Sequence, residues 1–397
     1  MYKVLKQSFA VNYEYDVHFT KGMFDTDNPI LSEVVEKQMG GPAKVLVVMD
    51  SSINQFNPDL LKKITNYMHA HSKTMVLCGE PLCLSGSEGI KNDPHFINMI
   101  YKCINEGGIC RHSYVMAIGG GALLDAVGFA AATAHRGVRL IRVPTTVLSQ
   151  DDSGVGVKNG INFFGKKNYI GTFAPPYAVI NDIDFVKSLA DRDWLSGLAE
   201  AVKVSLIKDA EFFHYIYNNA DALRETKDLD ILQNIICQSA NFHLKHIGTQ
   251  GDPFEMGSSR PLDFGHWAAH KLEQTTNHRL RHGEAVAIGV ALDSTYSYLT
   301  GLMSERDWRL IIDVFKKLNL ALFVPELTDN MADPYAEDSI FKGLIEFREH
   351  LGGQLTIMML KKIGQGMEVH EVDFDKYRQA IGLLQEIAES QVVDRIN

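Results

Sequence analysis

The first 180 residues alternate short, almost wholly apolar runs with longer segments whose apolar positions recur every three or four residues. The short runs predict strands buried on both faces, and the longer pattern predicts helices. Strands that alternate with helices in this way indicate parallel βαβ units. The strands are expected at 43–50, 74–80, 114–121, 138–146 and 177–182, with helices around 58–72, 95–107 and 123–137.

Beyond about residue 183 the pattern changes. Helical periodicity dominates segments 191–220, 229–247 and 262–290, and strand signals become rare. A short strand or hairpin is expected only near 354–364. The sequence therefore predicts an α/β domain over 1–182 and a mainly helical domain over 183–397.

Composition narrows the class of protein. The chain has 397 residues, of which 45% are hydrophobic and 22% charged, as in ordinary folded domains. No apolar run approaches the roughly 20 residues that span a bilayer, and the N-terminus lacks the features of a signal peptide, so a cytoplasmic protein is expected. A net charge of −10 without a basic run argues against a nucleic-acid partner. The five cysteines form no C-x-x-C pair, which favours reduced thiols over a disulfide frame or zinc finger.

A glycine-rich turn joins the third expected strand to its helix. In AIGGGALLDAVG, three glycines, Gly119 to Gly121, stand where a backbone can approach a phosphate closely and a helix N-terminus offers free N–H groups. A tight strand-to-helix turn is the alternative explanation. Asp50 and Glu80 end the first two expected strands, where carboxylates commonly accept hydrogen bonds from a ribose. We therefore expect a dinucleotide site.

Histidines gather in the segment 262–290. His266 and His270 share one helix face, and His282 begins the next helix. Upstream, Glu200 and Lys203 in LAEAVK also share a face. One Glu and two His with an open position suit catalytic zinc, so Glu200, His266 and His282 are the candidate ligands, with His270 available for proton transfer. Ordinary helix histidines remain the alternative, because spacing alone does not bring Glu200 to the imidazoles.

Lysines accumulate in the segment SQDDSGVGVKNGINFFGKKNYIG. It is either a flexible surface loop or a rim that binds an anion, with Lys158 and Lys167 directed to a phosphate and Asp152 to the substrate. Further cations that can supply positive charge are Lys203, Lys245 and Arg136.

Taken together, these motifs resemble the sugar phosphate cyclases, the superfamily that contains 3-dehydroquinate synthase. The matching stretches are GGGALLDAVGF, HRGVRLIRVPTT, DDSGVGVKNGIN, KKNYIGTF, GLAEAVK, LDFGHWAAH and RHGEAVAIG. The resemblance implies a carbon–oxygen lyase with a Rossmann-like, NAD-binding N-terminal domain and a helical, metal-binding C-terminal domain. It implies zinc or cobalt held by Glu200, His266 and His282.

The resemblance also implies roles for other residues. Substrate-handling positions are Asp152, Lys158, Asn168, Lys203, Lys245, Asp263 and His270. Arg136 joins Lys158 and Asn168 at the phosphate and acts on the neighbouring subunit's substrate, which implies a homodimer. The implied NAD contacts are Asp50, Glu80, Gly119, Gly120, Gly121, Asp125, Thr145, Thr146, Lys167 and Thr172.

Departures from the pattern point to a subfamily. Ser259 and Asp263 replace an Arg and an Asn that help hold a substrate carboxylate in dehydroquinate synthases, and an anionic Asp263 would repel a carboxylate but accept hydroxyl hydrogen bonds. Cys83 stands three after Glu80, where relatives tend to have a lysine.

PLDFGHWAAH, GVGVKNG and FREHLGG resemble the branch that cyclises sedoheptulose 7-phosphate, so a 2-epi-5-epi-valiolone synthase activity is expected. Alternatives are 2-epi-valiolone or desmethyl-4-deoxygadusol formation from the same sugar, and 3-dehydroquinate synthase activity. From other classes, a metal-dependent polyol dehydrogenase and an inactive NAD or sugar sensor remain open.

Overall fold

The computed structural model describes residues 3–35, 41–164, 166–250, 261–350 and 353–396. Contacts divide the chain into two compact units. Unit 1 comprises Met1–Pro144 and Val157–Asp182, and unit 2 comprises Thr145–Gly156 and Ile183–Asn397. The turn Thr145–Gly156, which the sequence assigns to the first domain, thus packs within the helical unit.

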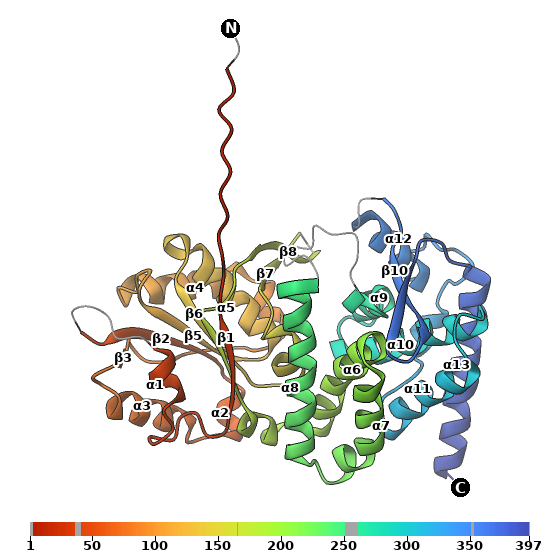
Figure 1. Cartoon of the computed structure of the whole chain (residues 1–397), viewed down its shortest axis with the longest axis horizontal. Coiled ribbons are helices and arrows are strands. Elements are labelled where there is room, and N and C mark those ends of the chain that lie inside the picture. The colour runs from red at the N-terminus through yellow and green to blue at the C-terminus, as the bar shows by residue number, and fades with distance from the viewer. Residues whose placement is uncertain (1–2, 36–40, 165, 251–260, 351–352, 397) are drawn as a thin grey trace. The chain divides into compact units, whose positions relative to one another are not determined.

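Unit 1 is built on a seven-stranded parallel sheet (Figure 1). The strand order is β1-β9-β6-β5-β2-β3, and β4 also pairs with β2. The strands are β1 Asp16–Thr20, β2 Ala43–Asp50, β3 Met75–Leu77, β4 Leu82–Leu84, β5 Tyr114–Gly119, β6 Arg139–Pro144 and β9 Ala178–Asp182. A parallel sheet with helical crossovers confirms the α/β fold class expected for this half.

Helices cover the sheet because its central strands are apolar on both faces. On one face, Leu46 and Val48 of β2 and Val115 and Ala117 of β5 form a core with α4 and α5. The helices of unit 1 are α1 Ile30–Val34, α2 Ile53–Phe56, α3 Leu60–Ala70, α4 Pro94–Glu106 and α5 Gly121–Thr133, with 3-10 turns η1 Glu88–Lys91 and η2 Ala134–Arg136.

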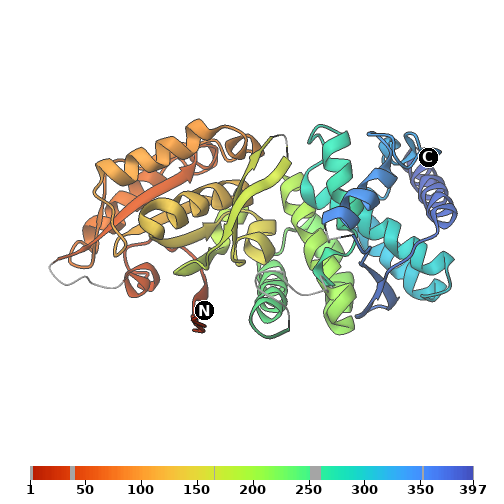
Figure 2. The same ribbon diagram turned by 90° about the horizontal axis from the view of Figure 1, so that it is seen from above.

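Three features of unit 1 differ from the sequence-based expectations. The strand expected at 74–80 ends at Leu77, and β4 resumes the pairing with β2 from Leu82, so Glu80 lies between two short strands and does not end one. β1 was not expected. The lysine-rich segment is an antiparallel ribbon of β7 Lys158–Phe163 and β8 Lys166–Phe173 that packs on α5 (Figure 2), and not an irregular loop.

Unit 2 is mainly helical, as expected for the second half (Figure 2). The predicted hairpin near 354–364 is present as β10 Ile357–Lys362 and β11 Gln365–Val369. The helices are α6 Asp191–Lys208, α7 Ala210–Glu225, α8 Leu229–Lys245, α9 His266–Thr275, α10 His282–Leu299, α11 Glu305–Lys317, α12 Ile340–His350 and α13 Phe374–Ile396. Short helical turns are η3 Ser149–Ser153, η4 Ile183–Ser188, η5 His246–Gln250, η6 Pro261–Asp263 and η7 Pro325–Thr328.

The state of the cysteines and the character of the helices bear on two expectations drawn from the composition. All five cysteines are free thiols, as predicted. Among the described residues, no helix has the length and apolar character needed to cross a bilayer.

Candidate active site

Three helices of unit 2 bring Glu200, His266 and His282 together. Glu200 Oε1 lies 3.4 Å from His266 Nε2 and 3.5 Å from His282 Nε2. One ligand atom from each residue falls within 4.8 Å of the other two. The structure thus brings Glu200 of the LAEAVK helix to the two imidazoles, which spacing in the sequence alone could not establish. Two nitrogens and one carboxylate oxygen are a donor set that suits zinc with an open coordination position.

Glycines let these helices approach so closely. Gly283 follows His282, and a Cβ atom built there would lie 1.9 Å from the carbonyl oxygen of Ser196 on α6. Farther along α10, a Cβ atom at Gly289 would lie 2.1 Å from the carbonyl oxygen of Gly265, the residue before His266. Any side chain at either position would push α10 away from α6 or α9. The glycines of RHGEAVAIG therefore set the spacing of the three candidate ligands.

Hydrogen bonds fix which ring nitrogen of each histidine faces Glu200. His266 Nδ1 lies 3.2 Å from the carbonyl oxygen of Phe264, and His282 Nδ1 lies 3.2 Å from Glu273 Oε2. A carbonyl or carboxylate oxygen accepts, so both Nδ1 atoms donate their protons. The lone pair of each Nε2 is then directed to the side where Glu200 lies, as metal coordination requires.

The centre of the cluster is buried and charged. Glu200 is fully buried and makes a close ion pair through Oε2 with Lys203, which is also buried. Burial alone would raise the pKa of Glu200, but Lys203 and His266 outweigh it and hold the pKa well below its usual range. Burial would likewise lower the pKa of Lys203, but Glu200, Asp152 and Asp263 raise it. Glu200 is therefore an anion and Lys203 a cation at neutral pH.

The other substrate-handling residues expected in unit 2 are His270, Asp152, Asp263 and Lys245. His270 is exposed, with its ring centroid 5.4 Å from that of His266 and 6.0 Å from that of His282. Asp152 on η3 and Asp263 on η6 act electrostatically on Lys203. Lys245 is exposed at the end of α8.

Thr145 and Thr146, two expected NAD contacts, follow β6, and the hydroxyl of Thr146 lies 2.8 Å from that of Ser149. Ser259 lies outside the described residues.

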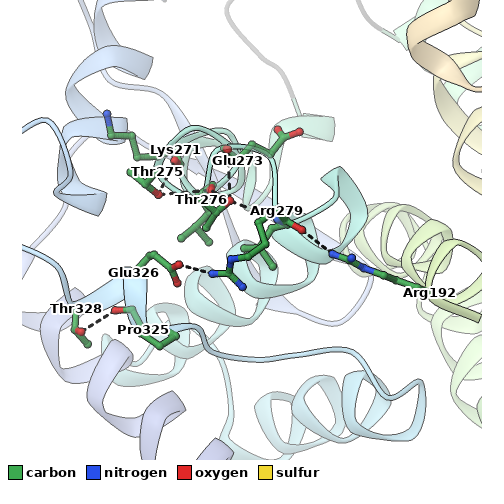
Figure 3. Close-up of polar contacts among 11 residues, drawn as sticks. Arg192, Lys271, Glu273, Thr275, Thr276, Arg279, Pro325, Glu326 and Thr328 are labelled. Carbon is green, nitrogen blue, oxygen red and sulfur yellow. Dashed lines mark hydrogen bonds and ion pairs between the residues drawn. The ribbon is translucent and has the colours of Figure 1, made fainter. Parts of the chain in front are cut away.

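A polar network holds the loop between α9 and α10, which leads to His282 (Figure 3). Arg192 of α6 donates to the carbonyl oxygen of Arg279 at 2.7 Å and makes two hydrogen bonds of 2.6 Å with the carboxylate of Glu284. Arg279 also pairs with Glu326, as Figure 3 shows. Because Arg192 and Glu200 share α6, these bonds tie the first turn of α10 to the helix that carries Glu200.

In unit 1 the glycine turn has the geometry expected of a phosphate-binding turn. Gly119 ends β5, Gly120 precedes the helix in extended conformation, and α5 begins at Gly121. The first N–H groups of a helix have no partner within the helix and can bind a phosphate. Asp50 ends β2, as predicted. Glu80 is exposed in the short gap between β3 and β4, so the prediction that it ends a strand is wrong.

A glutamate and a lysine that the sequence reasoning missed lie beside this turn. Lys91 is buried and donates to Asp125 of α5 at 2.9 Å, with Glu88 Oε1 at 3.5 Å. Burial would lower the pKa of Lys91, but Asp125 and Glu88 raise it. The position three residues after Glu80 is occupied by Cys83, where the family pattern has a lysine. Three residues after Glu88, that position is occupied by Lys91. The spacing of Glu88 and Lys91 could have identified this pair from the sequence. The prediction of one continuous strand over 74–80 favoured Glu80 instead.

The ribbon β7–β8 carries the remaining expected residues of unit 1. Lys158, Lys167 and Asn168 are exposed, and Asn168 has a left-handed backbone with φ of 52°. Thr172 and Arg136 line one pocket of about 310 Å³. The other lining residues of this pocket are Tyr13, Gly128, Ala132, Gly137, Val138, Leu140, Phe173, Ala174 and Pro175.

Two more residues near the histidine cluster were missed: His243 and Glu273. Both are buried, and each bonds a candidate site residue from another part of the chain. No short sequence motif identifies them, because His243 is 91 residues from Asp152 and Glu273 is nine residues from His282.

Comparisons with known proteins agree with this architecture. The family model for the N-terminal part of 3-dehydroquinate synthase matches residues 82–196, and the model for its C-terminal part matches 197–338. The 3-dehydroquinate synthase of Acinetobacter baylyi is 31% identical over 339 residues, which cover 85% of this chain and 88% of the relative. A 2-epi-5-epi-valiolone synthase of an Actinomyces species is 28% identical over 381 residues, or 94% of this chain and 95% of the relative.

A solved structure is similar over almost the whole length. The 2-epi-5-epi-valiolone synthase ValA of Streptomyces hygroscopicus subsp. jinggangensis 5008, solved with NAD+ and Zn2+ bound, matches with a TM-score of 0.84 and 27% identity. The match covers 96% of this chain and 99% of ValA. The two consecutive family models, the curated relatives and the shared fold show that the chain belongs to the 3-dehydroquinate synthase family, within the sugar phosphate cyclases.

Proposed function

We propose that this chain is an NAD- and metal-dependent lyase that converts sedoheptulose 7-phosphate into a C7 cyclitol of the 2-epi-5-epi-valiolone type. The observation that carries the proposal is the buried cluster of Glu200, His266 and His282 with Lys203 beside it. The near full-length similarity to two 2-epi-5-epi-valiolone synthases supports the choice of reaction.

We propose Glu200, His266 and His282 as ligands of zinc or cobalt, and the turn Gly119–Gly121 as the site of the NAD pyrophosphate. The donor atoms fit such a metal, since each imidazole directs an Nε2 lone pair to the side of an ionised, buried carboxylate. Asp50, Asp125, Thr145, Thr146, Lys167 and Thr172 remain the proposed NAD contacts, and Glu88 and Lys91 are better candidates than Glu80 for the adenosine end.

The chain's own residues handle the sugar and its phosphate. Bound NAD supplies a reversible hydride acceptor, and a bound divalent metal supplies Lewis acidity at neighbouring hydroxyls. Beside the carboxylates of Glu200 and Asp152 the pKa of Lys203 is raised, which favours a protonated side chain that donates hydrogen bonds. His270, exposed beside the other two imidazoles, is then the better group for proton transfer. Positive charge for the departing phosphate comes from Lys158, Lys245 and Arg136, with Asn168 as a hydrogen-bond donor.

Asp263 supports the choice of a sugar without a carboxylate. It lies near enough to Lys203 to raise that lysine's pKa, so it belongs to the charged surroundings of the cluster. A carboxylate at this position disfavours a substrate carboxylate and accepts hydrogen bonds from hydroxyls. The more numerous 3-dehydroquinate synthases among the relatives make the carboxylated heptulosonate phosphate the second candidate substrate.

The test compares the two sugars with the zinc-loaded chain and catalytic NAD. We expect inorganic phosphate to be released from sedoheptulose 7-phosphate without net formation of NADH, and Glu200→Gln to lose both bound metal and turnover. NMR of the product identifies its stereochemistry and separates the 2-epi-5-epi-valiolone product from 2-epi-valiolone and desmethyl-4-deoxygadusol. Preference for the heptulosonate phosphate would make the chain a 3-dehydroquinate synthase. Stoichiometric NADH without phosphate would make it a polyol dehydrogenase.

A further inference from the structure

A buried histidine outside the candidate ligand set contacts a proposed substrate residue. His243 lies in the last turn of α8, and its side chain is 5% exposed. Its Nδ1 lies 3.0 Å from Oδ1 of Asp152 on the turn η3. The helix α8 packs along η3, so the contact joins two segments about 90 residues apart. A histidine placed in this way either packs a helix on a turn or controls the aspartate.

The surroundings of the pair favour control of the aspartate. Asp152 has a 30% exposed side chain, whereas His243 is buried behind it. One ligand atom each from Asp152, Glu200 and His243 lies within 4.8 Å of the other two, and Asp152 also acts on Lys203. The aspartate is therefore held from its buried side, next to the proposed metal ligand, while its exposed side remains accessible to a small molecule.

A second metal ion is not needed to explain these three residues. The ammonium group of Lys203 already pairs with Oε2 of Glu200, and Asp152 adds to the negative potential around that ammonium group. Lys203 thus supplies the positive charge that a metal would bring. His243 Nδ1 lies 3.0 Å from Asp152 Oδ1, a distance at which the imidazole can donate a hydrogen bond that orients the carboxylate.

We propose that His243 is a positioning residue that orients Asp152, so that its second carboxylate oxygen, Oδ2, accepts a hydrogen bond from a hydroxyl of the sugar substrate. This inference rests on the proposed function, in which Asp152 handles the sugar. Without the histidine, the carboxylate loses one constraint on its rotation about the terminal bond, and its oxygens are held less firmly in one direction. Loss of a defined geometry for a reacting group costs turnover even when binding persists.

Two amide variants test the direction of the hydrogen bond. The side-chain nitrogen of asparagine is as many bonds from Cβ as Nδ1 of histidine, whereas that of glutamine corresponds to Nε2. His243→Asn should therefore keep kcat within about threefold of wild type, whereas His243→Gln and His243→Leu should lower it by about 10- to 100-fold. KM for sedoheptulose 7-phosphate and the bound zinc should stay near their wild-type values in all three variants. Equal kcat values for Asn and Gln, or zinc lost together with kcat, would overturn the inference.

A spectroscopic measurement tests the pair without any substrate. In the full chain labelled with 15N-histidine, the His243 signals are those that disappear in His243→Asn. We expect Nδ1 of His243 to carry a proton and its shift to move in Asp152→Asn. An unprotonated Nδ1, or a shift that Asp152→Asn leaves unchanged, would refute the pairing. If the wild-type chain releases phosphate from neither sugar, the proposed function fails instead, and the NMR result alone decides whether the histidine holds the aspartate.

Discussion

Glu273 holds one proposed metal ligand by a hydrogen bond. Its buried carboxylate accepts from Nδ1 of His282, which leaves Nε2 to face Glu200. In Glu273→Gln one acceptor oxygen becomes an NH2 group, so the imidazole loses the charged partner that fixes its tautomer. Outer partners of this kind typically contribute about 10- to 100-fold in metal affinity, and we expect the zinc affinity of the full chain to fall by that factor. Competition with a chromophoric chelator measures it.

Glu326→Gln is the matched control for that variant. Glu326 pairs with Arg279 of the same loop (Figure 3), and among the described residues no hydrogen bond or ion pair joins Glu326 to an imidazole. The Arg279 side chain is 60% exposed. Exposed ion pairs stabilise little, so the zinc affinity should remain within about threefold of wild type. If both variants weaken zinc binding equally, Glu273 acts by anchoring the loop and not by orienting His282.

The sequence revealed residues whose partners follow a short spacing rule. His266 and His270 at i, i+4 and Glu200 and Lys203 at i, i+3 predicted shared faces, and the structure brings Glu200, His266 and His282 together. His243 was not predictable in this way, because its hydrogen bond joins a helix to a turn far away in the chain. Glu88 escaped notice because the interruption between β3 and β4 shifted the end of the strand from Glu80 to Leu84.

At the scale of elements, a buried aspartate locks the start of α9 to two other helices. Asp293 of α10 accepts hydrogen bonds from the backbone N–H of Gly265 at 3.1 Å, from Trp267 Nε1 at 3.0 Å and from the hydroxyl of Tyr377 on α13 at 2.8 Å. Gly265 and Trp267 flank His266 in the sequence. The position of this candidate ligand therefore depends on contacts made by α10 and α13.

This aspartate should make the stability of the chain depend on pH. Burial raises the pKa of Asp293 to about 7, although its three donors lower it. In the unfolded chain the pKa returns to about 4, so between these values the folded state binds more protons. The free energy of unfolding should fall as the pH rises through this window, by roughly 4 kcal/mol from this group. Asp293→Asn removes the titration, and the variant should gain stability relative to wild type as the pH rises from about 4 to about 7.

Urea unfolding of the metal-free chain, followed by tryptophan fluorescence, measures this difference. Trp267 donates directly to Asp293, so the signal includes a local probe of the network. Curves for wild type and Asp293→Asn that remain parallel across the pH range would show that Asp293 is ionised in the folded chain throughout.

Helices and strands were predicted where one pattern decides the structure. β2 was predicted with its observed bounds, 43–50, because it is apolar on both faces, and α8 and α10 follow an uninterrupted helical pattern. The segment 191–220 was predicted as helical without a break, but it forms two helices. The break lies at Asp209, whose side chain caps α7 by accepting a hydrogen bond from the backbone N–H of Phe212 at 3.0 Å. The pairing of β7 with β8 was missed because glycines and lysines there are equally typical of loops.

At the scale of the whole molecule, the proposed reaction requires a cation that the sequence resemblance assigns to a second subunit. Arg136 is exposed in the turn η2 with a left-handed φ of 63°, and it lines a pocket with Thr172. An exposed arginine of this kind either serves its own chain or reaches a neighbour. The homodimer remains a prediction, and it makes the two possibilities separable, because a two-fold interface exchanges equivalent residues between identical subunits.

Mixing two inactive variants distinguishes these possibilities. Arg136→Ala should lower phosphate release strongly, and Glu200→Gln should abolish it, so neither homodimer is active. If Arg136 acts across the interface, a mixed dimer pairs an intact Glu200 in one subunit with an intact Arg136 in the other. Random re-association of equal amounts then restores about a quarter of the wild-type sites, since half of the dimers are mixed and each has one complete site. Mixtures that stay inactive, although sedimentation shows that the subunits have exchanged, would place Arg136 in the site of its own chain.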